Sequence, residues 1–201
     1  ILEKKIESLL KKYNFSKLFA KIPNKYSHYF QNKKFEIEAK IPNFFNGKED
    51  VIFFSKFLDS NRKLLNSKAN LDKILEIANT KQTMTNFDLS NSSYTIRQAS
   101  IKDTFAMSEL YKQVFSTYPF PIFDPNYIIS TMKDNIIYYG IWDNDQLVSL
   151  ASAEMDMKSQ NSEMTDFATL PNYRGKNFAS ILLHNLELKM QKLGIKTLYT
   201  I

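Results

Sequence analysis

A short basic turn between a predicted strand and a predicted helix is the part of this sequence best suited to chemistry. The turn contains Arg174, Gly175 and Lys176, and the spacing of apolar residues predicts an amphipathic helix over residues 178–193. The first turn of a helix carries unpaired backbone N–H groups and a partial positive charge, which suit an anion such as a pyrophosphate. Three small residues leave room for phosphate oxygens to approach the backbone: Gly175, Ala179 and Ser180.

The residues of this turn resemble the acetyl-coenzyme A loop of the GNAT acyltransferases. That loop has the pattern Q/R-x-x-G-x-G/A, and Arg174 and Ala179 match its first and last positions. Asn177 replaces the central glycine, and asparagine is the least costly substitute where a positive φ is required. The resemblance implies that acetyl-CoA is the acyl donor and that no metal takes part. It implies that the donor is bound by the loop and the strand before it, through Phe167, Ala168, Thr169, Arg174, Gly175, Lys176, Asn177, Phe178 and Ala179.

Further segments resemble the bacterial and archaeal beta-lysine N-acetyltransferases, which belong to the same superfamily. The likeness spans most of the chain and is carried by the segments Glu38–Lys56, Tyr118–Pro121, Glu154–Asp156 and Glu163–Pro171. It implies an N-acetyltransferase that transfers acetyl from acetyl-CoA to the terminal amine of beta-lysine. The expected product is the osmolyte N6-acetyl-beta-lysine.

Acetyl transfer to an amine requires a group that takes a proton from the ammonium ion, and a carboxylate, directly or through water, suits this role. We expect the catalytic carboxylate among Asp166, Glu163 and Glu154. Asp166 is preferred because it lies in the middle of the strand that would flank the thioester, although a hydrogen-bonded structural carboxylate is the alternative. Strand alternation places Glu163 and Thr165 on the face opposite Asp166, so a β-bulge is needed to bring them together.

The amine pocket is expected to involve the proline-rich loop over residues 117–125. Tyr118 and Phe120 in this loop, together with Asp166, are the predicted substrate-binding residues. Packing of the loop against the core is the alternative interpretation of Tyr118. The backbone N–H of Phe167 or Thr169 is expected to polarise the acetyl carbonyl. The resemblance also implies a tyrosine as general acid, on a helix that would follow residue 201.

Three other functions are left open by the sequence. The same fold could act on another amine, such as a polyamine, and the replacement at Asn177 favours a non-catalytic CoA-binding module. A basic binding module is the third, because residues 1–93 carry 17 basic and 10 acidic side chains. These lysines lack arginine clusters or an aromatic stacking motif, so they indicate a solvated face and nucleic acid is not expected as a partner.

The predicted elements from Tyr94 onward alternate as in an α/β domain. We expect strands at 94–96, 136–142, 146–154, 163–169 and 196–201, and helices from Ser100 to about 115, at 125–133 and at 178–193. The order β-α-α-β-β-β-α-β matches the first two-thirds of the GNAT acyl-CoA N-acyltransferase fold, a mixed, mostly antiparallel sheet with flanking helices.

The pattern of the N-terminal residues predicts a smaller α+β segment, which resembles a degenerate half of the same fold. Residues 1–57 predict a helix, a strand, a short helix and a hairpin that turns at Asn46-Gly47, and residues 61–82 predict a further helix. We expect an N-terminal segment over 1–85, a linker over 86–93 and an acetyltransferase domain over 94–201. The ends of the sequence suggest a truncated chain whose last domain is incomplete at its C-terminus.

Composition sets outer bounds on the class of protein. The 201 residues are 43% hydrophobic and 24% charged with a net charge of +6, which predicts a folded chain. The absence of cysteine excludes disulfides and thiolate chemistry. No apolar run approaches the ~20 residues of a membrane span, and no secretory signal is visible, so a cytoplasmic location without membrane partners is expected. A homodimer is left open.

Overall fold

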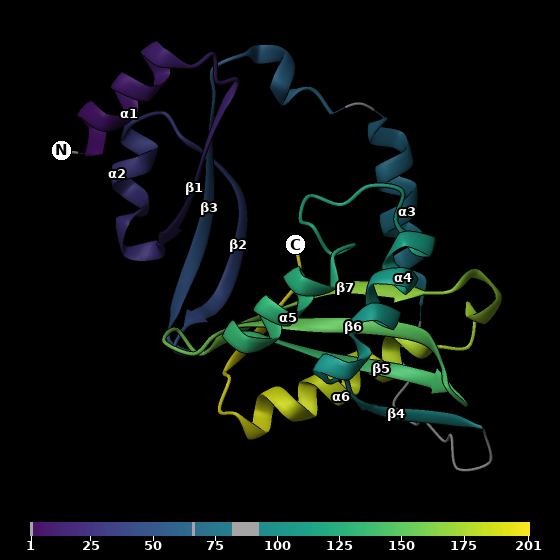
Figure 1. The fold of residues 1–201 in the computed structure, drawn as a ribbon. Helices are drawn as coiled ribbons and strands as arrows, with labels where there is room; N and C mark the ends of the chain where they lie inside the picture. The colour runs from purple at the N-terminus through teal and green to yellow at the C-terminus, as the bar shows by residue number, and fades with distance from the viewer. Residues whose placement is uncertain (1, 66, 82–92) are drawn as a thin grey trace. The chain divides into compact units, whose positions relative to one another are not determined.

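The chain forms two compact units in the structure, which is a computed structural model that describes residues 2–65, 67–81 and 93–201 (Figure 1). Ile1–Asn43 and Lys48–Thr83 make up the first unit, and Phe44–Gly47 and Met84–Ile201 make up the second. The predicted linker lies outside the described residues except for its last position, so the domain boundaries stay a prediction. No helix in the described part of the chain is long and apolar enough to span a membrane.

The first unit contains a three-stranded sheet in the order β1-β3-β2. Its elements are α1 (Leu2–Lys12), β1 (Lys17–Pro23), α2 (Ser27–Asn32), β2 (Glu36–Phe45) and β3 (Glu49–Phe57). The central strand β3 buries Val51, Ile52, Phe53 and Phe54, whereas Ile37 on the edge strand β2 is 51% exposed. The predicted turn is present: three residues, Asn46, Gly47 and Lys48, join β2 to β3, and Asn46 and Gly47 both have positive φ.

The helix predicted over residues 61–82 is wrong as a single element. A short 3₁₀ helix covers Ser60–Lys63, and α3 begins only at Lys68 and ends at Thr80. Leu64 has an extended backbone and Ser67 a left-handed one (φ 65°), and neither conformation can continue a right-handed helix. The apolar residues of α3 are between 45% and 61% exposed: Leu71, Ile74, Leu75 and Ile77.

The second unit contains a five-stranded sheet in the order β4-β5-β6-β7-β8. The strands are β4 (Tyr94–Gln98), β5 (Ile136–Asp143), β6 (Gln146–Asp156), β7 (Asn161–Thr169) and β8 (Thr197–Tyr199), and all neighbours are antiparallel except β7 and β8. Helices α4 (Thr104–Val114) and α5 (Pro125–Asp134) cover one face, and α6 (Phe178–Lys192) covers the other (Figure 1). The predicted order of elements from Tyr94 onward is confirmed.

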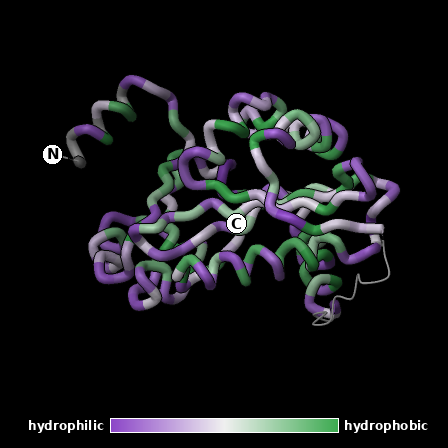
Figure 2. The backbone as a smooth tube through the Cα atoms, turned by 60° about the horizontal axis from the view of Figure 1, so that its bottom comes forward, coloured by the Kyte–Doolittle hydropathy of each residue, from purple (hydrophilic) through white to green (hydrophobic). Residues whose placement is uncertain are grey.

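The core of this unit lies between the sheet and its helices. Strand β6 is central and is buried from Leu147 to Ala153, because helices cover both of its faces. Hydrophobic and hydrophilic residues alternate along the helices, as expected for elements with one side on a sheet and the other in solvent (Figure 2). Residues of β6 and β7 line one cavity together with α5 and the loop that precedes it.

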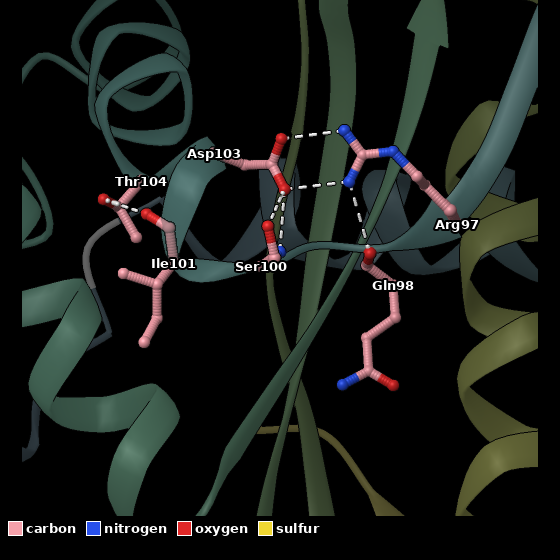
Figure 3. A network of polar contacts seen from close by, with 6 residues as sticks. All are labelled: Arg97, Gln98, Ser100, Ile101, Asp103 and Thr104. Carbon is pink, nitrogen blue, oxygen red and sulfur yellow. Dashed lines mark hydrogen bonds and ion pairs between the residues drawn. The ribbon is translucent and has the colours of Figure 1, made fainter.

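The junction between β4 and α4 is held by a polar network around Asp103 (Figure 3). The Asp103 carboxylate accepts two hydrogen bonds from the Arg97 guanidinium, at 2.7 and 2.8 Å, and others from the backbone N–H and hydroxyl of Ser100. The Arg97 guanidinium also lies 3.6 Å from the ring centroid of Trp142. Ser100 thus begins the helical segment at the predicted position, through a capping box with Asp103.

The second unit also includes the hairpin tip Phe44–Gly47, which lies outside the predicted range 94–201. The Asn161 side-chain amide donates a hydrogen bond of 3.1 Å to the Phe44 carbonyl, and the Asn46 N–H donates one of 2.6 Å to the Ser159 carbonyl. Phe44 is 1% exposed and its ring centroid lies 5.1 Å from that of Tyr199. The tip therefore belongs to the packed structure beside β7 and β8.

Candidate active site

A cavity of about 610 Å³ lies where the loop before α5 meets α5 and the strands β5, β6 and β7. All three candidate carboxylates, Asp166, Glu163 and Glu154, line it, as do both predicted loop residues, Tyr118 and Phe120. The remaining lining residues are Ile122, Tyr127, Ser130, Thr131, Asp134, Asn135, Ile136, Tyr138 and Thr165. The cavity thus combines aromatic walls with four carboxylates.

A β-bulge in β7 brings the carboxylates into one cavity. Leu150 pairs with Ala168 and Ser152 pairs with Thr165, so Asp166 and Phe167 together oppose the single residue between them on β6. Asp166 has a left-handed backbone, with φ of 55°. A bulge of this kind changes the face to which following side chains point. The bulge that the sequence required is therefore present, and Glu163, Thr165 and Asp166 all line the cavity.

The carboxylate of Asp166 is held at both oxygens. The Tyr118 hydroxyl donates a hydrogen bond to Oδ1, and the Ser152 hydroxyl donates one of 2.7 Å to Oδ2. Ser152 is completely buried. Burial, together with the bond to the Asp166 carboxylate, raises the pKa of Tyr118 to about 12. Tyr118 therefore keeps its proton, and acts as a donor, throughout the neutral range.

The opposite wall of the cavity comes from α5 and β5. Tyr138 and Thr131 share a hydrogen bond of 2.9 Å between their hydroxyls, and burial raises the pKa of Tyr138 and of Tyr127. Sequence reasoning missed these residues and Ser152. The signal that could have found them is the helical spacing of Tyr127, Thr131 and Asp134, which places them on one face of α5.

Glu154 and Glu163 lie directly opposite each other on β6 and β7. Glu163 is also the register partner of Tyr199 on β8. Burial raises the pKa of the Tyr199 hydroxyl, and the charges of Glu163 and Glu154 raise it further. In the described part of the chain, no group of three or more His, Asp or Glu side chains is placed to hold a metal ion.

The predicted acetyl-CoA loop forms a separate small pocket of about 280 Å³ at the start of α6. Its lining consists of Thr169, Tyr173, Arg174, Gly175, Asn177, Phe178, Ala179 and Ser180. Gly175 and Asn177 have positive φ, 80° and 61°, so the asparagine has the conformation that the family's glycine would supply. A Cβ at Gly175 would meet no atom within 4 Å, and the first backbone N–H groups of α6 have no partner within the helix. These features fit a diphosphate.

Only some of the nine predicted donor-binding residues line this loop pocket. Arg174 lines the loop pocket, and its Nε donates a bond of 3.3 Å to the Thr169 carbonyl. Lys176 does not line it; its Nζ lies 2.6 Å from the Tyr94 hydroxyl and it borders a neighbouring cavity of about 650 Å³. Phe167 and Ala168 are also absent from the lining, because they lie further back on β7 and Ala168 is buried.

The edge of β7 beside the loop pocket is open. Strand β8 pairs with β7 only from Asn161 to Glu163, so no described strand pairs with Thr165–Thr169 on that side. The backbone between the bulge and the loop therefore has no strand partner on that side among the described residues. The arrangement joins the carboxylate-lined cavity to the anion-binding turn along one strand.

Comparisons with known proteins agree with this geometry. The model of the acetyltransferase (GNAT) family matches residues 104–201. The chain is 34% identical over 198 residues to the beta-lysine N(6)-acetyltransferase of Methanococcus maripaludis, covering 98% of this chain and 72% of that protein.

Two shorter matches point the same way. The chain is 40% identical over 136 residues to the N-acetyltransferase YodP of Bacillus subtilis, covering 67% of this chain and 49% of that protein. It is 42% identical over 108 residues to the beta-lysine N(6)-acetyltransferase of Methanosarcina mazei, covering 54% of this chain and 40% of that protein. The chain therefore belongs to the GNAT family of acetyltransferases, with the fold of that family and acetyl-CoA as its acyl donor.

Proposed function

We propose that the chain transfers the acetyl group of acetyl-CoA to the terminal amine of beta-lysine, which gives the osmolyte N6-acetyl-beta-lysine. The observation that carries the proposal is the cavity in which Asp166, Glu154 and Glu163 meet Tyr118, one bulge away from the anion-binding turn. The similarity to the Methanococcus maripaludis protein over nearly the whole chain supports the choice of amine.

In this proposal Asp166 takes the proton from the substrate ammonium group. Tyr118 and Ser152 each donate to one carboxylate oxygen, which leaves further lone pairs on both oxygens for the amine or a bridging water. The free amine then attacks the thioester carbonyl carbon, so that a C–N bond forms and the C–S bond breaks. The nitrogen loses its second proton, which passes to the departing thiolate and gives free CoA as the thiol.

The chain's own residues also orient the donor. The loop pocket, with Arg174 at its edge and the first N–H groups of α6, would hold the diphosphate. The open edge of β7 would receive the pantetheine arm, and the backbone N–H of Phe167 or Thr169 would stabilise the developing oxyanion. Tyr118 and Phe120 would enclose the amine.

The replacement Asp166→Asn tests the assignment. A general base contributes about 100-fold or more, so we expect kcat with beta-lysine to fall by at least that factor. The dissociation constant for acetyl-CoA, measured by calorimetry, should stay within about twofold because the loop pocket is untouched. Asp145→Asn, in the exposed turn between β5 and β6, is the matched control. Equal losses in turnover and donor binding would remove Asp166 from this role.

A further inference from the structure

The acceptor cavity has an unbalanced charge. Of the described residues that line it, four are carboxylates, Asp134, Glu154, Glu163 and Asp166, and none is Lys, Arg or His. Only one carboxylate is needed to take the proton of the reacting amine. The cavity also offers no cation to pair with a substrate carboxylate, and its negative charge would repel one. Its lining therefore fits a substrate with more positive charge than one amine supplies.

Two of these carboxylates repel each other electrostatically. Glu154 and Glu163 lie directly opposite each other on neighbouring strands, where like charges destabilise the sheet. Both side chains line the cavity, so a cation held there would meet both carboxylates and offset their repulsion. Asp166 is separated from this pair along the strand and accepts hydrogen bonds from Tyr118 and Ser152. Glu163 is itself hydrogen-bonded to the Tyr199 hydroxyl, a neutral donor that leaves the negative charge of the pair in place.

The distance between Asp166 and the Glu154–Glu163 pair suits a short diamine. Thr165, the neighbour of Asp166, lies two residues beyond Glu163 on β7, and two residues of a strand span about 7 Å. Two nitrogens joined by four carbons lie about 6 Å apart when extended, by ordinary bond lengths. One amine can thus reach Asp166 while the other reaches the opposed pair.

We propose that Glu154 and Glu163 bind the non-reacting ammonium group of the substrate, so that the cavity selects diamines with about four carbons between the nitrogens. The substrate carboxylate is left to solvent and contributes little to recognition. Glu154 and Glu163 are then specificity-determining residues rather than proton acceptors. This inference rests on the proposed function, because it takes the cavity as the acceptor site of an amine acetyltransferase.

Three acceptor substrates separate the contribution of the second amine from that of the carboxylate. Beta-lysine differs from 6-aminohexanoate only by the second amine, and from 1,4-diaminopentane only by the carboxylate. With the full chain and saturating acetyl-CoA, we expect kcat/KM for 6-aminohexanoate to be at least about 10-fold below that for beta-lysine, because an ion-paired hydrogen bond is lost. The value for 1,4-diaminopentane should lie within about threefold of that for beta-lysine or above it.

Glu154→Gln and Glu163→Gln should each lower kcat/KM for both diamines by about 10-fold and leave 6-aminohexanoate within about threefold. Glu187→Gln, an exposed position on α6, is the control and should change none of the three. Glu154 is exposed, so Glu154→Gln should fold and can test the inference even if Glu163→Gln does not fold. Binding of acetyl-CoA, measured by calorimetry, shows whether each variant is folded.

Equal kcat/KM for beta-lysine and 6-aminohexanoate, or losses in the glutamine variants that are the same for all three acceptors, would overturn the inference. Failure of the proposed function gives a different result. A chain that acetylates 1,4-diaminopentane in a Glu154-dependent manner but not beta-lysine would reject beta-lysine and keep the diamine. A chain that binds acetyl-CoA but neither acetylates nor binds any of the three by calorimetry would overturn both.

Discussion

The Tyr118 hydroxyl donates a hydrogen bond to Oδ1 of Asp166, and the two residues are 48 positions apart in the chain. Tyr118 lies in the loop between α4 and α5, and Asp166 lies at the bulge of β7. The contact joins a loop to the strand that carries the candidate base. It therefore couples the position of the loop that lines the cavity to the orientation of the carboxylate proposed as the base.

Replacement of Tyr118 by phenylalanine should lower kcat by about 10-fold, because one hydrogen bond to a charged group is lost while the ring is kept. The KM for acetyl-CoA should stay within about twofold. Steady-state kinetics with beta-lysine measures both. Tyr139→Phe is the matched control, since alternation along β5 directs Tyr139 away from the face to which Tyr138 contributes. An unchanged kcat with a lowered melting temperature would limit Tyr118 to packing.

The conformation of Asn177 should set the affinity for acetyl-CoA. Its φ of 61° is accessible to glycine without steric cost, so Asn177→Gly should tighten acetyl-CoA binding by a few fold. Asn177→Val should weaken it by about 10-fold, because a β-branched residue resists this conformation. Calorimetric titration measures both. Asn144→Gly, at another asparagine with positive φ in the β5–β6 turn, should leave the affinity unchanged. The same affinity in all variants would argue against a role of the loop in donor binding.

The network at the start of α4 should make stability depend on pH in the acid range. The Arg97 guanidinium, with smaller contributions from Ser100, holds the pKa of Asp103 well below its usual range. A depressed pKa means that the stabilisation is complete above the unfolded-state pKa of about 3.9 and is lost as the pH falls further. We expect the free energy of unfolding to decrease between about pH 4 and pH 2.

Asp103→Asn tests this contribution by urea denaturation. The variant should lose about 1–2 kcal/mol at pH 7, from the cap and the ion pair together, and should show a shallower decrease below pH 4. Asp145→Asn removes an exposed acid from a turn and should follow the wild type. Parallel pH curves for Asp103→Asn and the wild type would contradict the assignment.

Gly140 should be required by the packing of the sheet. A Cβ at this position would lie 2.6 Å from the Trp142 ring and 2.7 Å from a Leu147 methyl group. Gly140→Ala should therefore destabilise the chain by about 1–3 kcal/mol through overpacking, measured by thermal denaturation. A second replacement, Leu147→Val, should recover part of the loss if the clash is the cause. An unchanged melting temperature for Gly140→Ala would show that the two side chains can move aside.

Local sequence patterns were enough to predict the order of elements from Tyr94 onward and a turn with positive φ before α6. Both depend on short-range signals: the cap at Ser100, the turns between strands, the prolines before α5 and the YRGKNFA pattern at Tyr173–Ala179. Such signals act over a few residues, where backbone sterics and local hydrogen bonds dominate. Such signals failed at residues 61–82, because the extended backbone of Leu64 and the left-handed backbone of Ser67 interrupt a segment that the apolar spacing predicts as one helix.

The assembly of the cavity depends on long-range contacts that no segment of the sequence predicts. The sequence required a bulge, but its place at Asp166 and Phe167 follows from the pairing of β7 with β6. The contacts of Asp166 with Ser152 and Tyr118 join residues 14 and 48 positions apart, and no local pattern marks such pairs. Sheet register and the packing of a loop against strands set these distances, because they depend on the simultaneous burial of many side chains rather than on the preferences of any one segment.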